Sequence, residues 1–138
     1  PYTTLFRSCM ASIPVAGPGI GVVRNNMKDA RNYGQSRGMA LPKTYYWFYQ
    51  KVRNKGPWDY KQFDPYWAEF GNFNFGAAGY AAGILSGILL VGAGWAQKRA
   101  GTSRPEWGIW YKDAPYGDDP TDQYWIREGI KYAIENGY

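Results

Sequence analysis

The chain has 138 residues, of which 45% are hydrophobic and 20% charged. This composition fits one globular domain with a real core and does not favour a disordered chain. There is no histidine, and the single cysteine is Cys9. Those absences exclude His-ligated and Cys-ligated metal centres, internal disulfides, and acid–base or nucleophilic catalysis by histidine. An enzyme of this composition must transfer protons with Asp, Glu, Lys or Tyr.

Two further features of the composition point to polymeric ligands. Sixteen Lys and Arg residues against eleven Asp and Glu give a net charge of +5, which favours nucleic acid, an anionic cell wall or a membrane surface. Aromatic residues make up 19% of the chain. Their rings can stack on sugars or bases, but a core built from large rings explains any single one more simply.

Residues 1–41 are predicted to precede the main domain. The first eight, Pro1 to Ser8, look like translated sequencing adapter and are left out of the fold prediction. Residues 11–41 are rich in Gly, Asn, Ser and Pro, which is typical of a linker or a surface loop, with a short helix at 24–33. We therefore divide the chain into an adapter-like start with a linker or loop, 1–41, and an effector domain, 42–138.

Two helices are predicted over residues 43–70. Pro42 suits a first helical turn, and Gly56-Pro57 ends the helix that follows, predicted at 43–54. Its apolar face has the i, i+3, i+4, i+7 spacing of Tyr45, Phe48, Tyr49 and Val52. After an aromatic and polar loop, a second short helix over 63–70 carries Glu69.

Residues 76–96 contain no charged side chain. Their length fits a transmembrane helix, and Gly79, Gly83 and Gly87 have the spacing that lets membrane helices approach closely. The alternative is a buried hairpin of two short helices rich in Gly and Ala. We favour the hairpin because glycines and alanines weaken the hydropathy and polar segments flank both sides. No stable membrane insertion is expected.

The remaining residues predict a loop and a final helix. Lys98-Arg99-Ala100-Gly101 is a cation–glycine helix end. Residues 102–118 form a Trp-rich loop, within which a short β element near 106–112 stays open. Asp119 is predicted to cap the last helix, with Pro120 in its first turn and Gly137 at its end. Its buried stripe is Ile126, Ile130, Ala133 and Ile134. The expected fold is a mainly α, compact single-domain helical bundle.

Four separated blocks carry a family resemblance. They are residues 54–62, 69–79, 94–97 and 117–123, in this order, and together they resemble the bacterial polymorphic toxin type 44 family over roughly two-thirds of the chain. The resemblance implies a C-terminal toxin domain of a secreted protein used in conflict between bacteria, delivered by a dedicated secretion system, and a cognate immunity protein in the producing cell. It also implies a polar or charged break within 84–92, where this sequence has no charged residue.

The candidate catalytic residues are Glu69, Asp59 and Lys61. Burial of Glu69 against Trp67 and Phe70 would raise its pKa and make it a general acid. Asp59 could be a second carboxylate, although a turn or helix-cap role is the simpler explanation. The candidate substrate-binding residues are Trp58, Tyr60, Asn72, Asn74, Trp95 and Gln97. Asp118, Asp119 and Asp122 are explained by helix capping and the helix dipole, with a Ca²⁺ or Mg²⁺ site as the alternative.

The leading functional hypothesis is a hydrolase that cleaves the glycan strands of peptidoglycan with a carboxylate pair, which needs neither histidine nor metal. The first alternative is a metal-independent RNase that uses Lys61, Tyr60 and Glu69, because the charge and the aromatic residues also suit RNA. The second is a membrane-inserting toxin built on residues 76–96. We expect no cofactor, no metal, and a protein secreted or delivered into target bacteria, where the periplasm is favoured over the cytoplasm.

Overall fold

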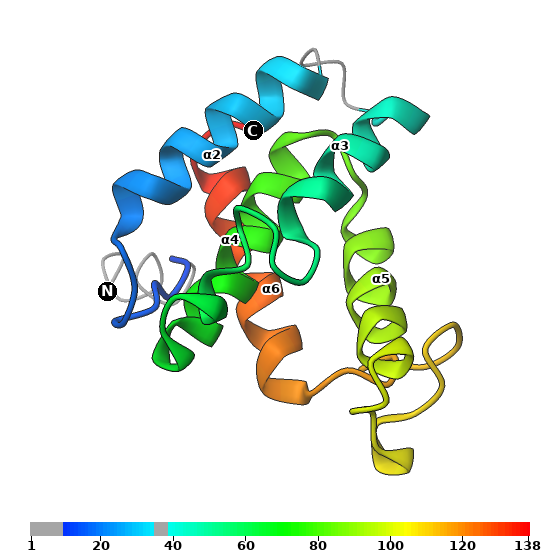
Figure 1. The fold of residues 1–138 in the computed structure, drawn as a ribbon. Helices are drawn as coiled ribbons and strands as arrows, with labels where there is room; N and C mark the ends of the chain where they lie inside the picture. The colour runs from blue at the N-terminus through cyan, green and yellow to red at the C-terminus, as the bar shows by residue number, and fades with distance from the viewer. Residues whose placement is uncertain (1–9, 35–38) are drawn as a thin grey trace, which may run out of the picture.

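The computed structural model describes residues 10–34 and 39–138 (Figure 1). The helices are α2 (Ile20–Gly34), α3 (Pro42–Val52), α4 (Ala68–Ala81), α5 (Ser86–Arg99) and α6 (Pro120–Glu135). Three short 3₁₀ helices are η1 (Tyr60–Gln62), η2 (Pro65–Trp67) and η3 (Pro105–Trp107). The mainly α prediction is confirmed. The described residues contain no strand. Residues 106–112 form the end of η3 and the loop and turn that follow it, so the short β element considered there is wrong.

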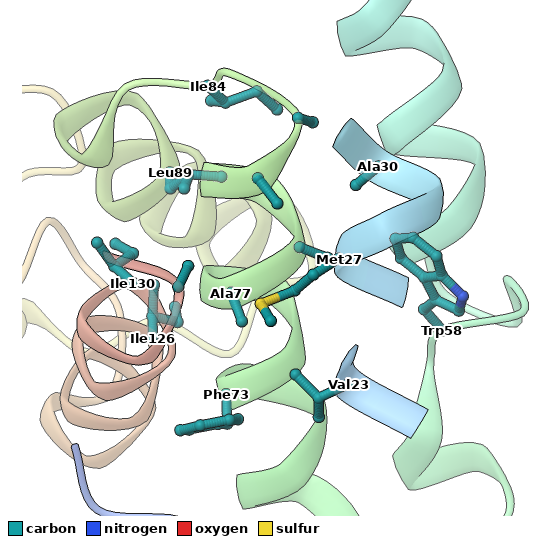
Figure 2. Close-up of a cluster of buried hydrophobic side chains, with 14 of the residues drawn as sticks. Val23, Met27, Ala30, Trp58, Phe73, Ala77, Ile84, Leu89, Ile126 and Ile130 are labelled. Carbon is teal, nitrogen blue, oxygen red and sulfur yellow. The ribbon is translucent and has the colours of Figure 1, made fainter. Parts of the chain in front are cut away.

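Helices α4 and α6 cross at the centre of the molecule with their backbones in contact. A Cβ atom at Gly76 would overlap the carbonyl oxygen of Ile126, and one at Gly129 would overlap the carbonyl oxygen of Phe73. Only glycine allows this approach, because any side chain would hold the two helices apart. Phe73 and Ile126 beside the crossing are 0% and 1% exposed, so the crossing is also the middle of the core (Figure 2).

Helix α2 covers the other side of α4. Val23, Met27 and Ala30, at the i, i+4, i+7 spacing of one helical face, are buried against it. Figure 2 shows Met27 beside Ala77 of α4. Residues 20–34 therefore belong to the core, whereas the sequence placed them in a linker or loop with a helix only at 24–33.

Helix α3 contributes to the core through one large side chain. Phe48 is 5% exposed and packs against the rings of Trp58 and Phe75, with centroids 6.4 and 5.3 Å away. Tyr45 and Tyr49, predicted on the same buried face, are exposed. The face that packs is narrower than the sequence pattern indicated, because α3 lies at the edge of the bundle.

The uncharged segment 76–96 is divided between α4 and α5. Gly83 has a φ of +88°, which the turn between the helices requires and which disfavours other residues. Helix α4 is buried along most of its length, but α5 buries only Leu89 and Gly94 and stands at the side of the molecule (Figure 1). Among the described residues, no helix has the length and apolar content to cross a membrane.

The ends of α5 and α6 follow their local sequence signals. Helix α5 ends at Arg99, before Gly101 with a φ of +74°. The Asp119 carboxylate accepts a hydrogen bond from the Thr121 N–H at 2.8 Å and caps α6, as predicted. Ile126, Ile130 and Ala133 are buried, as predicted. Ile134, at 53% exposed, was wrongly included in the stripe because it lies beyond the edge of the contact with α4.

The backbone contact at the α4–α6 crossing gives a direct stability prediction. Gly129→Ala should destabilise the protein by about 3 kcal/mol or more, since overpacking a core typically costs about 1–3 kcal/mol and here the new methyl group meets backbone. Gly92→Ala in α5 is the matched control, because its Cβ would meet no atom within 4 Å. Helix propensity predicts that this control stabilises by up to about 1 kcal/mol. Urea unfolding measures both, and equal effects would contradict the close approach.

Candidate functional site

Three carboxylates gather where the chain enters α6. Asp118 is 2% exposed, and its carboxylate accepts hydrogen bonds from the Gln123 side-chain N–H at 2.8 Å and from the Asp119 backbone N–H. The same Gln123 nitrogen donates to the carbonyl oxygen of Leu90 in α5 at 3.0 Å. Gln123 is itself fully buried. Asp118 is thereby held in a defined position between α5 and α6.

The environment of Asp118 and Asp122 makes these two carboxyl groups harder to ionise. Burial, followed by the negative charges of Asp118 and Asp119, raises the pKa of Asp122 to about 6. Burial also raises the pKa of Asp118 above its ordinary value. The charge of Lys61 and a hydrogen bond from the Asn72 side chain act in the opposite direction on Asp122. A carboxyl with a pKa near 6 can both hold and release a proton around neutral pH.

Residues far apart in the sequence form this cluster, which we call the carboxylate cluster: Asp118, Asp119, Asp122, Lys61 and Asn72. Lys61 comes from η1, Asn72 from the first half of α4, and the three aspartates from the start of α6. Gly94 of α5 supports the loop before them, because its backbone lies directly against the carbonyl oxygen of Tyr116. The four blocks that carried the family resemblance therefore meet at one place.

The proposed general acid of the sequence analysis lies outside this environment. Glu69 is in the first turn of α4 and is exposed. The expectation that Trp67 and Phe70 bury it is wrong: Phe70 turns into the core, while Trp67 is only half-buried. The burial that was the physical reason for choosing Glu69 as an acid is therefore absent. Burial raises the pKa of Asp118 and Asp122.

Three of the predicted ligand-binding side chains are part of the interior. Trp58 and Tyr60 are each 8% exposed, and Asn74 is fully buried. Asn26 in α2 donates hydrogen bonds to the Tyr60 hydroxyl at 2.7 Å and to the Asn74 side-chain oxygen at 2.9 Å. Burial raises the pKa of Tyr60. These groups tie α2, η1 and α4 together, and no face of either ring is free to stack on a ligand.

Two other predicted residues stabilise local turns. The Asp59 carboxylate accepts the backbone N–H of Lys55 at 2.9 Å, in agreement with the simpler explanation of Asp59 as a turn residue. Gln97 donates to the Thr102 hydroxyl at 2.9 Å and holds the chain after α5. Trp95 remains accessible on α5, where the Arg99 guanidinium lies 5.3 Å from its ring centre.

Of the cluster, Lys61 and Asn72 were predicted from the sequence as site residues, whereas the three aspartates were explained by helix capping and the helix dipole. That explanation holds for Asp119, which caps Thr121. It does not hold for Asp118, whose carboxylate is bound by Gln123. The sequence did contain a signal for this site, because three carboxylates occur within five residues of one block. A single helix cap requires only one of them.

A family model described as Bacterial toxin 44 matches residues 50–135, more than half of the chain. The chain belongs to this family. The matched range extends from the end of α3 to the last residue of α6 and includes every member of the carboxylate cluster. This toxin domain has no match among curated proteins or solved structures. Within the described part of the chain, no group of three or more Cys, Asp or Glu side chains has the arrangement of a metal site.

The raised pKa of Asp122 predicts a pH-dependent stability. Between an unfolded pKa near 3.8 and a folded pKa of about 6, the folded toxin binds more protons, so its stability falls as pH rises through this window. Asp122→Asn removes that cost. Above about pH 6.5 the variant should be more stable to unfolding than the parent protein by about 2 kcal/mol, a figure that already allows for the lost interaction between Asp122 and the helix dipole. Near pH 4 this gain in stability should vanish.

Urea unfolding at a series of pH values measures this difference. Glu69→Gln is the control, because Glu69 is exposed at the favourable end of a helix and its replacement should only slightly destabilise the protein through the lost interaction with the helix dipole. A gain for Asp122→Asn that is equal at both ends of the pH range would contradict the raised pKa.

Proposed function

We propose that this toxin domain is a hydrolase that cleaves the glycan strands of peptidoglycan, with Asp122 as the general acid. The observation that carries the proposal is the pKa of about 6 for Asp122 in a cluster that holds two further carboxylates. Glycoside hydrolysis needs one carboxyl that is protonated and one that is ionised, in different environments. A chain without histidine can perform this chemistry with these groups alone.

The contacts suggest a role for each member of the cluster. Asp122 would give its proton to the oxygen of the leaving sugar. Ionised Asp118 and Asp119 would keep Asp122 protonated and stabilise the positive charge that develops on the sugar ring. Asn72 would hold the Asp122 carboxyl in place, and Lys61 would keep its pKa from rising too far to release the proton.

The charge of the cluster favours a glycan over RNA. Three carboxylates face one lysine, so the cluster is negative when ionised and repels a phosphodiester, whereas a neutral sugar ring meets no such barrier. The RNase alternative is supported by the net charge of +5 and by exposed Lys61, which could contact a phosphate. A peptidoglycan substrate implies action in the periplasm of the target cell, and the family makes a cognate immunity protein in the producing cell an expected partner.

Substitution of the two candidate acids tests the assignment. Asp122→Asn should lower the rate of peptidoglycan cleavage by about 10²–10⁴-fold, the usual contribution of general acid catalysis. Glu69→Gln should retain most of the activity because Glu69 is exposed and outside the cluster. Release of reducing sugars from purified sacculi gives the rates, and thermal melting verifies that both variants fold. The reverse order of effects would return Glu69 to the mechanism and remove Asp122.

Directed expression separates the two substrates. The full chain should kill bacteria when exported to the periplasm and should be tolerated in the cytoplasm, because the wall lies outside the inner membrane. Cleavage of sacculi should survive EDTA and decline as pH rises through the pKa of Asp122, since the acid is then ionised. Killing from the cytoplasm alone, with degradation of total RNA, would instead establish the RNase.

A further inference from the structure

The outer face of α5 carries an apolar surface that no other helix covers in the described part of the chain. Leu85, Ile88 and Trp95 are 60%, 45% and 39% exposed, although large apolar side chains of this kind are usually packed inside. They border an open groove of about 670 Å³. The groove is lined by Leu85, Gly87, Ile88, Val91, Gly92, Trp95, Trp110 and Tyr116, and we call this surface the α5 groove.

The α5 groove has few hydrogen-bonding groups for a polar ligand. Its only polar side-chain groups are the indole N–H of Trp95 and Trp110 and the hydroxyl of Tyr116. A sugar or a nucleotide needs a hydrogen-bond partner for each polar group that it buries, and this lining cannot provide them. The occupant of the groove is therefore mainly apolar where it makes contact.

Positive charge surrounds one end of this surface. No Asp or Glu occurs between Phe70 and Pro105, while the same stretch contains Lys98, Arg99 and Arg104. The Arg99 guanidinium lies over the Trp95 ring, at the border of the groove. The Ser103 hydroxyl donates to the carbonyl oxygen of Gly117 at 2.6 Å, which holds the residue before Arg104 next to the Tyr116 wall.

The adjoining loop adds both signs of charge. Lys112 follows the Trp110–Tyr111 pair, Glu106 and Asp113 are the exposed carboxylates of that loop, and Asp118 at its end is buried. On the surface, four cations against two exposed carboxylates leave the region positive. Tyr111 and Ile109 in the same loop are 65% and 46% exposed, so apolar and cationic side chains are interleaved from α5 into the loop.

We propose that the α5 groove and its cationic border form a docking surface for an anionic lipid bilayer. Apolar side chains with Trp at the boundary and Lys or Arg beside them are the composition of helices that lie in a membrane interface. Helix α5 has 14 residues and is about 21 Å long, shorter than the roughly 30 Å hydrocarbon layer, so it lies along the surface without crossing.

A partner protein fits this surface less well. A specific protein interface is usually ringed by polar groups that form hydrogen bonds, about one for each 100–200 Å². The α5 groove has cations at its border and few neutral polar groups. Lipid head groups need only negative charge, and acyl chains need only apolar contact, so the bilayer requires nothing that this surface lacks. The docking surface is separate from the carboxylate cluster and does not depend on which bond that cluster cleaves.

Vesicle sedimentation with the full chain tests the proposal. The toxin should bind vesicles that contain phosphatidylglycerol, bind pure phosphatidylcholine vesicles at least tenfold more weakly, and lose affinity as salt is added. Leu85→Ser with Ile88→Ser should weaken binding by roughly tenfold or more through lost apolar contact. Lys98→Glu with Arg99→Glu should weaken it by about 25-fold or more, at about fivefold for each basic residue.

Matched substitutions elsewhere control for general loss of charge and apolar surface. Ile134→Ser in α6 and Lys28→Glu in α2 change exposed residues far along the chain and should leave vesicle binding unchanged. All of the changed side chains are exposed, so thermal melting should show folded proteins. Equal binding to both vesicle types, absence of binding, equal losses for the control variants, or self-association of the chain through the α5 groove in place of vesicle binding would each overturn the proposal.

Discussion

The close backbone approach of α4 and α6, where Gly76 lies against Ile126 and Gly129 against Phe73, is the constraint on which the rest of the fold depends. Figure 1 shows α4 and α6 starting from the same end of the molecule and crossing at its centre. Because neither glycine has a Cβ atom, the two helices approach until carbonyl oxygens fill the space where side chains would be. Their starts are thereby close enough for Asn72 of α4 to reach Asp122 of α6. A wider crossing would separate these two residues before it disturbed either helix.

The carboxylate cluster lowers the stability of the folded protein at neutral pH. Asp118 and Asp122 are both held where burial opposes their ionisation, and the charge of Asp118 raises the pKa of Asp122 further. A protein selected only for stability would place apolar or amide side chains there. The hydrogen bonds of Gln123 to Asp118 and to α5 fix this unfavourable arrangement in place. Stability sacrificed at one polar cluster is typical of catalytic sites.

Features that depend on residues close together in the chain were predicted from the sequence, and features that depend on distant residues were not. The cap at Asp119 and the end of α5 before Gly101 depend on neighbouring residues, and both were predicted correctly. The burial of Met27 depends on the position of α4, which no local pattern encodes, so the helix predicted at 24–33 was expected in a linker or loop and not in the core. The same limit applies to the site. Glu69 lies among aromatic residues in sequence and is exposed in space, whereas Asp122 looks like an ordinary first-turn carboxylate and is shielded by α4 and η1.

The segment 76–96 has no charged side chain, yet the part of it that lies in α5 is mostly not buried. A helix that is apolar on all sides is normally enclosed by protein or by lipid. The inner side of α5 is enclosed by protein: Leu89 packs in the core, Gly94 lies against Tyr116, and the Leu90 carbonyl accepts from Gln123. Residues 10–34 and 39–138 provide no such cover for its outer side, and the bilayer proposed for it would supply one. On this argument the two sides of α5 are apolar for different reasons. The inner side positions the carboxylate cluster, and the outer side would hold the toxin at the membrane next to the wall that the cluster is proposed to cleave.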